Sequence, residues 1–136
     1  MELEHRGAQR RTEETLGQLS HSIIACAMNV HTRMGPGLLE SVYETCLCHE
    51  LSNRAMEFRR QVAIPVQYDG HLLECGFRAD LVVENSVIVE VKAVDALKSI
   101  HDSQLLTYLR LSHLPVGLLI NFNTRHLREG IRRKVF

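Results

Sequence analysis

The segment from Val116 to Phe122 most restricts how this chain can fold, because it is a nearly continuous run of apolar residues. A run without polar alternation is typical of a strand that is buried on both faces. The spacing of apolar residues just before it predicts a helix over Ile100–Leu111. We therefore expect a sheet in which at least one strand is covered on both sides.

The earlier part of the chain predicts two helices and then a series of strands. The first helix should end at Gly35-Pro36-Gly37, because proline cannot continue a helix and glycine permits turn conformations. Asp69-Gly70 lies between two strand-like segments and is a strong hairpin signal. The predicted helices cover 16–34 and 38–53, and the predicted strands cover 62–68, 72–77, 80–83 and 87–92. The element order is then α, α, three or four β, α, β.

The composition predicts one globular domain without disulfide or metal support. Its 136 residues include 16 basic and 16 acidic side chains, for a net charge of zero, and 45% of the residues are hydrophobic. We expect a polar segment over residues 1–14 and a single domain over 15–136, with its cysteines reduced. No apolar run approaches the roughly 20 residues that span a bilayer, and the N-terminus does not resemble a signal peptide. The expected location is therefore cytoplasmic, with no membrane partner.

The C-terminal quarter is basic although the whole chain is neutral. From Arg110 onward, Glu129 is the only acidic residue, whereas six arginines and lysines occur there. Such a patch either contacts phosphate groups or is simply a solvated face, and the second is the more common case.

Two carboxylates are expected side by side in the hairpin formed by residues 80–92. Antiparallel partners are equidistant from the turn, so a turn centred on Asn85 places Asp80 directly across from Glu90. Lys92 shares their face, because side chains in a strand alternate. Two acids among apolar residues need a compensating positive charge, which Lys92 and a divalent metal such as Mg²⁺ would supply. The alternative is an amphipathic hairpin whose charged face meets solvent.

Two helices add polar residues with an open interpretation. Glu40 lies at the edge of the apolar stripe of the second helix, and either faces a cleft or caps the first turn. Gln104 and Tyr108 lie on the helix face expected to pack against the sheet, so they belong either to a functional site or to a structural hydrogen-bond network.

Taken together, these motifs resemble the GxxExxY proteins of the PD-(D/E)XK nuclease superfamily. The sequence GLLESVY runs from Gly37 to Tyr43, and it is followed in order by Asp80, EVK at residues 90–92, and QLLTY at residues 104–108. The resemblance covers about residues 20–136. It implies an α/β, restriction-endonuclease-like core with a central mixed sheet of four to five strands flanked by helices (αβββαβ).

The resemblance also implies roles for individual residues. Asp80 and Glu90 match acidic metal ligands, Val91 would add its backbone carbonyl, and Glu40 matches the helix-borne acid that completes the site. Lys92 matches the lysine that positions or activates the attacking water. Gln104 and Tyr108 match a motif that orients the site and the nucleic acid, and His31 also fits the family pattern without a defined role.

Three functions remain open at this point. The first is a nuclease that depends on Mg²⁺ or Mn²⁺ and cleaves DNA. The second is a non-catalytic nucleic-acid-binding or interaction module that retains the fold, and the third is a plain structural domain. The short chain leaves no room for a separate DNA-binding domain, so sequence specificity would come from a protein partner or a homo-oligomer.

Overall fold

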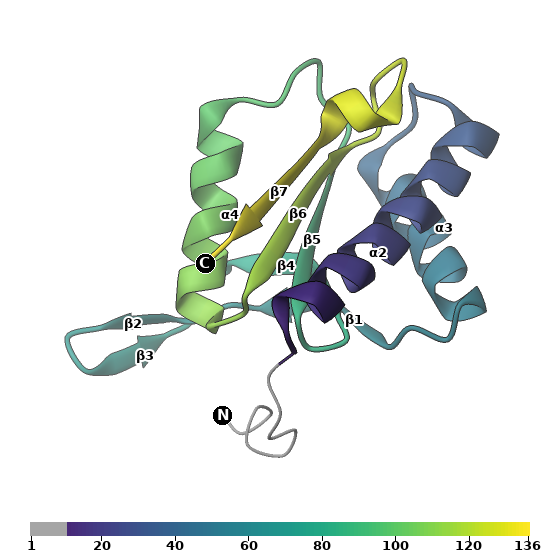
Figure 1. Ribbon diagram of the computed structural model, residues 1–136. Coiled ribbons are helices and arrows are strands. Elements are labelled where there is room, and N and C mark those ends of the chain that lie inside the picture. The colour runs from purple at the N-terminus through teal and green to yellow at the C-terminus, as the bar shows by residue number, and fades with distance from the viewer. Residues whose placement is uncertain (1–10) are drawn as a thin grey trace.

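The computed structural model describes residues 11–136, which form a five-stranded mixed sheet flanked by helices (Figure 1). The strand order is β1-β4-β5-β6-β7, and β2 and β3 pair separately. In chain order the elements are α2 Glu13–Met34, α3 Glu40–Asn53, β1 Phe58–Ala63, β2 Val66–Tyr68, β3 His71–Leu73, β4 Arg78–Val83, β5 Val87–Lys92, α4 Ser99–Ser112, β6 Val116–Asn121, the 3₁₀ helix η1 Leu127–Gly130 and β7 Ile131–Val135. The predicted class of fold is confirmed.

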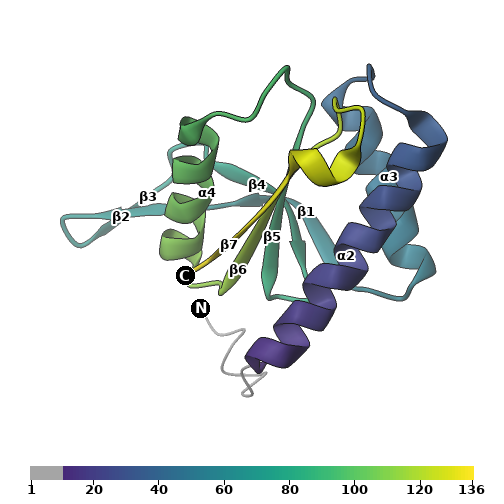
Figure 2. The ribbon, with the colours of Figure 1, turned by 45° about the horizontal axis from the view of Figure 1, so that its top comes forward.

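Helices cover both faces of the sheet. Helices α2 and α3 lie on one side and α4 lies on the other (Figure 2). Along β5, Val87 and Val89 belong to the apolar cluster under α2 and α3, whereas Ile88 belongs to the cluster under α4. All six residues of β6 are buried. The prediction of a strand buried on both faces is therefore confirmed. The apolar clusters on the two faces of the sheet provide most of the hydrophobic stabilisation.

The turn between α2 and α3 explains Gly35 and the glycine and tyrosine of the GxxExxY motif. Gly35 and Gly37 have φ angles of 68° and 101°, a region that side chains other than glycine rarely adopt. The Tyr43 hydroxyl donates to the Gly35 carbonyl at 2.6 Å and accepts from the Leu38 amide at 3.1 Å. Its ring stacks on Phe122 with centroids 4.6 Å apart. Tyr43 thus fixes the start of α3 against the end of β6.

The strands before β4 differ in part from the sequence prediction. The turn at Asp69-Gly70 is confirmed, with Tyr68 paired to His71. However, Val62 belongs to a separate strand that begins at Phe58, so the predicted strand over 62–68 is two strands, and 74–77 is not strand. The β2–β3 hairpin projects from the body of the molecule (Figure 1) and exposes Tyr68 and Leu72.

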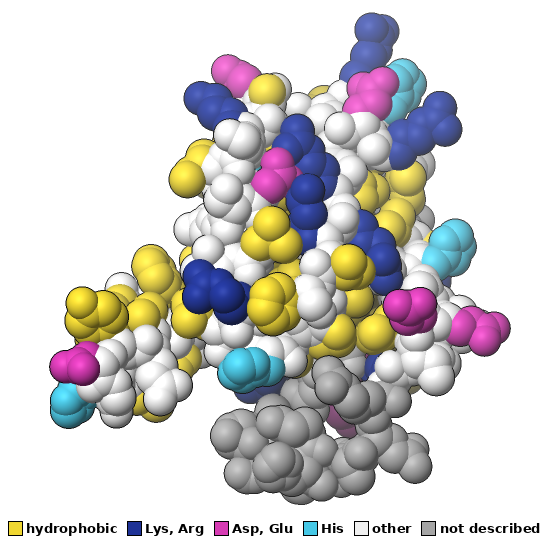
Figure 3. All heavy atoms as spheres, turned by 60° about the vertical axis from the view of Figure 1, so that its left-hand side comes forward, with side chains coloured by type: hydrophobic (Ala, Val, Ile, Leu, Met, Phe, Trp, Pro, Cys, Tyr) yellow, Lys and Arg dark blue, Asp and Glu magenta, His cyan; other side chains and the backbone are white. Residues whose placement is uncertain are grey.

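The C-terminal strand β7 is absent from the sequence prediction. It pairs antiparallel with β6 and forms an edge of the sheet. Its residues Arg132, Arg133 and Lys134 account for much of the basic C-terminal quarter, and charged side chains on an edge strand oppose pairing with other chains. On the side that carries α4, Lys and Arg side chains gather in a band over the middle of the surface (Figure 3).

The predicted polar N-terminal segment lies largely outside the described residues. Within them, α2 begins at Glu13, and Thr12 caps it by accepting a hydrogen bond from the Thr15 amide. Among residues 11–136, no helix has the length and hydropathy needed to cross a membrane.

Replacement of Tyr43 by phenylalanine should destabilise the protein without changing its fold. Tyr43→Phe leaves the Gly35 carbonyl and the Leu38 amide without their partner, and losing buried hydrogen bonds of this kind costs about 1–3 kcal/mol. Urea denaturation measures the loss. Tyr68→Phe is the matched control, because that side chain is 70% exposed, and its effect should be under about 0.5 kcal/mol. Equal effects of the two changes would contradict this account.

Candidate active site

The turn between β4 and β5 has the register that the paired carboxylates require. The pairs Leu81 with Val89 and Val83 with Val87 are centred on Asn85. Glu84 and Asn85 have φ angles of 52° and 51°, which close the tight turn. The predicted three-residue connection is therefore confirmed.

Asp80 and Glu90 are joined by reciprocal bonds between side chain and backbone. The Asp80 amide donates to Glu90 Oε2 at 2.8 Å, and the Val91 amide donates to Asp80 Oδ2 at 2.9 Å. Each carboxylate therefore binds the backbone of the opposite strand, beyond the last ladder pair of Leu81 with Val89. These bonds hold the two acids beside each other on the face of the sheet that carries α4.

Burial raises the pKa of both acids. The Glu90 side chain is 5% exposed. Its desolvation, and then the charge of Asp80, raise the pKa of Glu90 to about 8. The pKa of Asp80 is also raised, chiefly by burial and then by the charge of Glu44, against the lowering effect of the Val91 amide. One proton at Glu90 therefore relieves the repulsion between the two acids at neutral pH.

Lys92 supplies part of the compensating charge. It is half-buried at the end of β5, and its positive charge lowers the pKa of both Asp80 and Glu90. Within this part of the chain, Lys92 is the lysine nearest in sequence to the two acids. Its position fits either neutralisation of the acids or action on a reacting phosphate.

Glu44 is a third acid at this site that the sequence prediction missed. It lies one turn after Glu40 in α3, is 7% exposed, and raises the pKa of both Asp80 and Glu90 by its charge. Arg60 Nε contacts its carboxylate at 3.1 Å. The spacing of four residues from Glu40 was a usable signal, because such positions share a helix face.

Gln61 connects Glu44 to Asp80. Its side-chain nitrogen donates to both Glu44 oxygens at 3.2 and 3.3 Å and to Asp80 Oδ1 at 3.3 Å. Gln61 stands where the β1–β4 register would place the partner of Asp80, and its φ angle of 50° interrupts that ladder. A left-handed residue other than glycine is costly, and such strain concentrates at functional sites. The pairing of β1 with β4 was not predicted, so no sequence signal identified Gln61.

The other predicted site residues lie at different distances from the pair. Glu40 is exposed and accepts from the Ala93 amide at 3.1 Å, which places it at the end of β5 rather than beside Glu90. Tyr108 is buried on α4, and its pKa is raised by burial and then by the charges of Glu90 and Asp80. Gln104, one turn earlier, is exposed. His31 is not part of this group, because its Nε2 lies 2.7 Å from the Thr124 carbonyl.

The donor set fits a hard divalent cation that retains other ligands. Over residues 11–136, no three His, Cys, Asp or Glu side chains converge closely enough to hold a metal by themselves. Asp80 and Glu90 nevertheless offer two carboxylates, and Mg²⁺ is commonly bound by one or two carboxylates together with waters and substrate phosphates. The chemistry of the site therefore fits Mg²⁺ or Mn²⁺ better than zinc, which prefers nitrogen and sulfur.

Comparison with known proteins identifies the class to which this fold and site belong. The family model of the PD-(D/E)XK nuclease superfamily matches residues 17–134, nearly all of the described chain. The chain belongs to this superfamily. Neither a curated protein nor a solved structure matches it.

The raised pKa of Glu90 predicts a specific pH dependence of stability. The folded protein keeps a proton on Glu90 up to about pH 8, whereas the unfolded chain releases it near the ordinary value of 4.5. Stability should therefore fall as the pH rises between these values, by at most about 1.4 kcal/mol per pH unit from this group. Glu90→Gln should remove that slope in urea denaturation between pH 5 and pH 8. The exposed control Glu74→Gln should retain it, and parallel curves for all three proteins would contradict the assignment.

Proposed function

We propose that this protein is a metal-dependent nuclease that hydrolyses phosphodiester bonds in DNA. The observation that carries the proposal is the pair of Asp80 and Glu90, held by each other's strands, with Lys92 two residues further on. The superfamily to which the chain belongs supports it. We also propose that the chain is a GxxExxY protein within that superfamily, on the motif from Gly37 to Tyr43.

Asp80, Glu90 and the backbone carbonyl of Val91 would hold Mg²⁺ or Mn²⁺. A bound metal of this kind lowers the pKa of water and stabilises negative charge on a phosphoryl oxygen. Glu44 is linked to Asp80 through Gln61 and its charge acts on both acids, so we propose it as the helix-borne acid of the site, with Glu40 at the rim beside Ala93. Binding of the cation would require Glu90 to release its proton, because a carboxylate binds a metal in its deprotonated form.

The protein's own residues supply the remaining parts of the reaction. The positive charge of Lys92 acts on both acids, and in the reaction it would offset the charge that develops on the phosphate. Gln61 donates to Asp80 Oδ1 from the side of β1 while the Val91 amide donates to Oδ2, so both oxygens of this carboxylate are held in place. Tyr108 is buried on α4 within reach of the charges of the pair, and Gln104 is exposed one turn away, where it would contact nucleic acid.

A non-catalytic nucleic-acid-binding module is the second candidate. The observation that favours it is that Asp80 and Glu90 have no third metal-ligating side chain close enough within residues 11–136. A protonated Glu90 and an ion-paired Glu44 would also form a stable site without metal. The two candidates differ in whether divalent metal produces cleavage.

Cleavage should require both the metal and Asp80. We expect purified protein to cut labelled DNA in Mg²⁺ or Mn²⁺ and to lose that activity in EDTA. Asp80→Asn should abolish cleavage, since it removes a metal-binding charge, and should also abolish the rise in melting temperature that bound metal causes. Asp69→Asn, at the tip of the β2–β3 hairpin, is the matched control and should behave like the natural chain. Metal-dependent melting without cleavage in any substrate would favour the second candidate.

Lys92 should act on the reaction rather than on metal binding. Lys92→Ala removes a cation but no metal ligand, so the melting temperature should still respond to Mg²⁺. The cleavage rate at saturating DNA should fall about 10²-fold or more, the usual effect of losing one electrostatic stabiliser. Single-turnover kinetics and DNA binding, measured separately, check this. Weaker binding with an unchanged rate would assign Lys92 to phosphate anchoring instead.

A further inference from the structure

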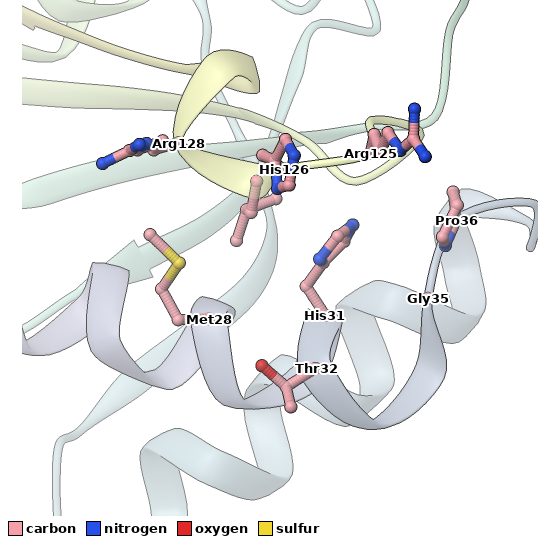
Figure 4. Close-up of a pocket in the computed structure, with 9 residues that line it drawn as sticks. Met28, His31, Thr32, Gly35, Pro36, Arg125, His126 and Arg128 are labelled. Carbon is pink, nitrogen blue, oxygen red and sulfur yellow. The ribbon is translucent and has the colours of Figure 1, made fainter.

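A basic pocket lies between the end of α2 and the segment that carries η1, apart from the carboxylates. Its volume is about 520 Å³. His31 and His126 lie on opposite sides of it, with His31 Nε2 2.7 Å from the Thr124 carbonyl, and Arg125 and Arg128 flank it (Figure 4). Met28 and Leu127 supply apolar lining. The pocket therefore combines side chains from two elements that are far apart in the sequence.

The charge of this pocket is uncompensated. Its lining contains no Asp or Glu. Among residues 11–136, Arg125 and Arg128 have no ion pair, whereas Arg132 and Lys134 on β7 both contact Asp102. The two arginines at the pocket are thus available to neutralise an anion, unlike Arg132 and Lys134.

Buried hydrogen bonds fix the segment that follows β6. The Asn121 side chain is 2% exposed; its Oδ1 accepts from the Val94 and Asn123 amides, and its Nδ2 donates to the Val94 carbonyl. A Cβ atom at Gly130 would lie 2.4 Å from the Asn121 carbonyl, so the chain approaches itself closely here. A pocket held in this way loses little conformational entropy when a ligand binds.

The pocket opens at the same end of the sheet as the candidate active site. β5 and β6 run parallel, with Lys92 paired to Asn121, and the Phe122 amide donates to the Lys92 carbonyl at 2.9 Å. Arg125 and His126 follow within a few residues of that bond. A polynucleotide with one phosphate near Lys92 therefore has further phosphates to place along this edge.

We propose that this basic pocket, lined by His31, Arg125 and Arg128, binds a backbone phosphate of the nucleic acid, away from the bond that is cut. This inference rests on the proposed function for the identity of the polymer. Guanidinium groups suit the recognition because they present several donors to phosphate oxygens. Basic residues in the last turn of α2 also complement its dipole, but Arg125 and Arg128 come from another segment and have no such role.

The test is DNA binding by the full chain in EDTA, where metal-dependent cleavage does not occur. Arg125→Gln and Arg128→Gln should each weaken binding of a labelled duplex roughly 3- to 10-fold near 0.1 M salt and reduce the slope of log Kd against log salt by about 0.9, the effect of one lost phosphate contact. Arg54→Gln is the matched control, because Arg54 is exposed at the opposite end of α3 from Glu40. Its slope should equal that of the natural chain. Equal losses in all three variants would overturn the pocket and indicate only the general field of the protein.

Competition distinguishes a polymer phosphate from a small anion. Unlabelled duplex should displace the labelled duplex far better than inorganic phosphate or a mononucleotide does. If binding of inorganic phosphate depends on Arg125 and Arg128 while duplex binding does not, the pocket is a small-anion site and the proposal fails. Because these measurements involve no cleavage, they stand whether or not the protein is a nuclease, and an inactive protein that shows the expected slopes would reject only the proposed reaction.

Discussion

The reciprocal bonds between Asp80 and Glu90 determine how the centre of this molecule is arranged. Each carboxylate accepts a hydrogen bond from a backbone amide of the neighbouring strand, with nitrogen–oxygen distances of 2.8 and 2.9 Å. The two acids therefore replace backbone partners where the β4–β5 ladder ends. A shift of one residue in the register of β4 and β5 would place Asp80 and Glu90 on different faces of the sheet and break both bonds. The turn centred on Asn85 therefore has two consequences: it completes the sheet, and it brings together two charges that would otherwise separate.

Placing Asp80 and Glu90 side by side has an electrostatic cost, which several surrounding groups reduce. Glu90 keeps a proton, Lys92 lowers the pKa of both acids, and Gln61 donates to Asp80. Glu44 adds a third acid, which Arg60 pairs with from the edge strand. A buried charge without such partners would cost several kcal/mol. These partners compensate the acids without a metal, and in the function we propose a divalent cation would take the place of the proton.

The sequence predicted the parts of this site that depend on local pattern. The register at Asn85, the placement of Asp80 with Glu90, and the strand buried on both faces follow from alternation and turn length. Gln61 and β7 could not be predicted, because a single sequence does not specify which distant strands pair. Glu44 was missed for a different reason. The motif contains Glu40 and not Glu44, and the burial of Glu44 depends on how α3 packs against the edge formed by β1.

The distribution of charge on this neutral chain also bears on how it could handle a polyanion. Asp80, Glu90 and Glu44 lie at the candidate active site, and those of them that are charged would repel a phosphate group until cations are bound. The unpaired arginines lie apart from them, at the same end of the sheet. A nucleic acid could therefore be held by the pocket before its phosphate enters the acidic site, so that binding and metal-dependent chemistry use different residues. This separation is possible because β5 and β6 run parallel, which places the segments that follow them side by side.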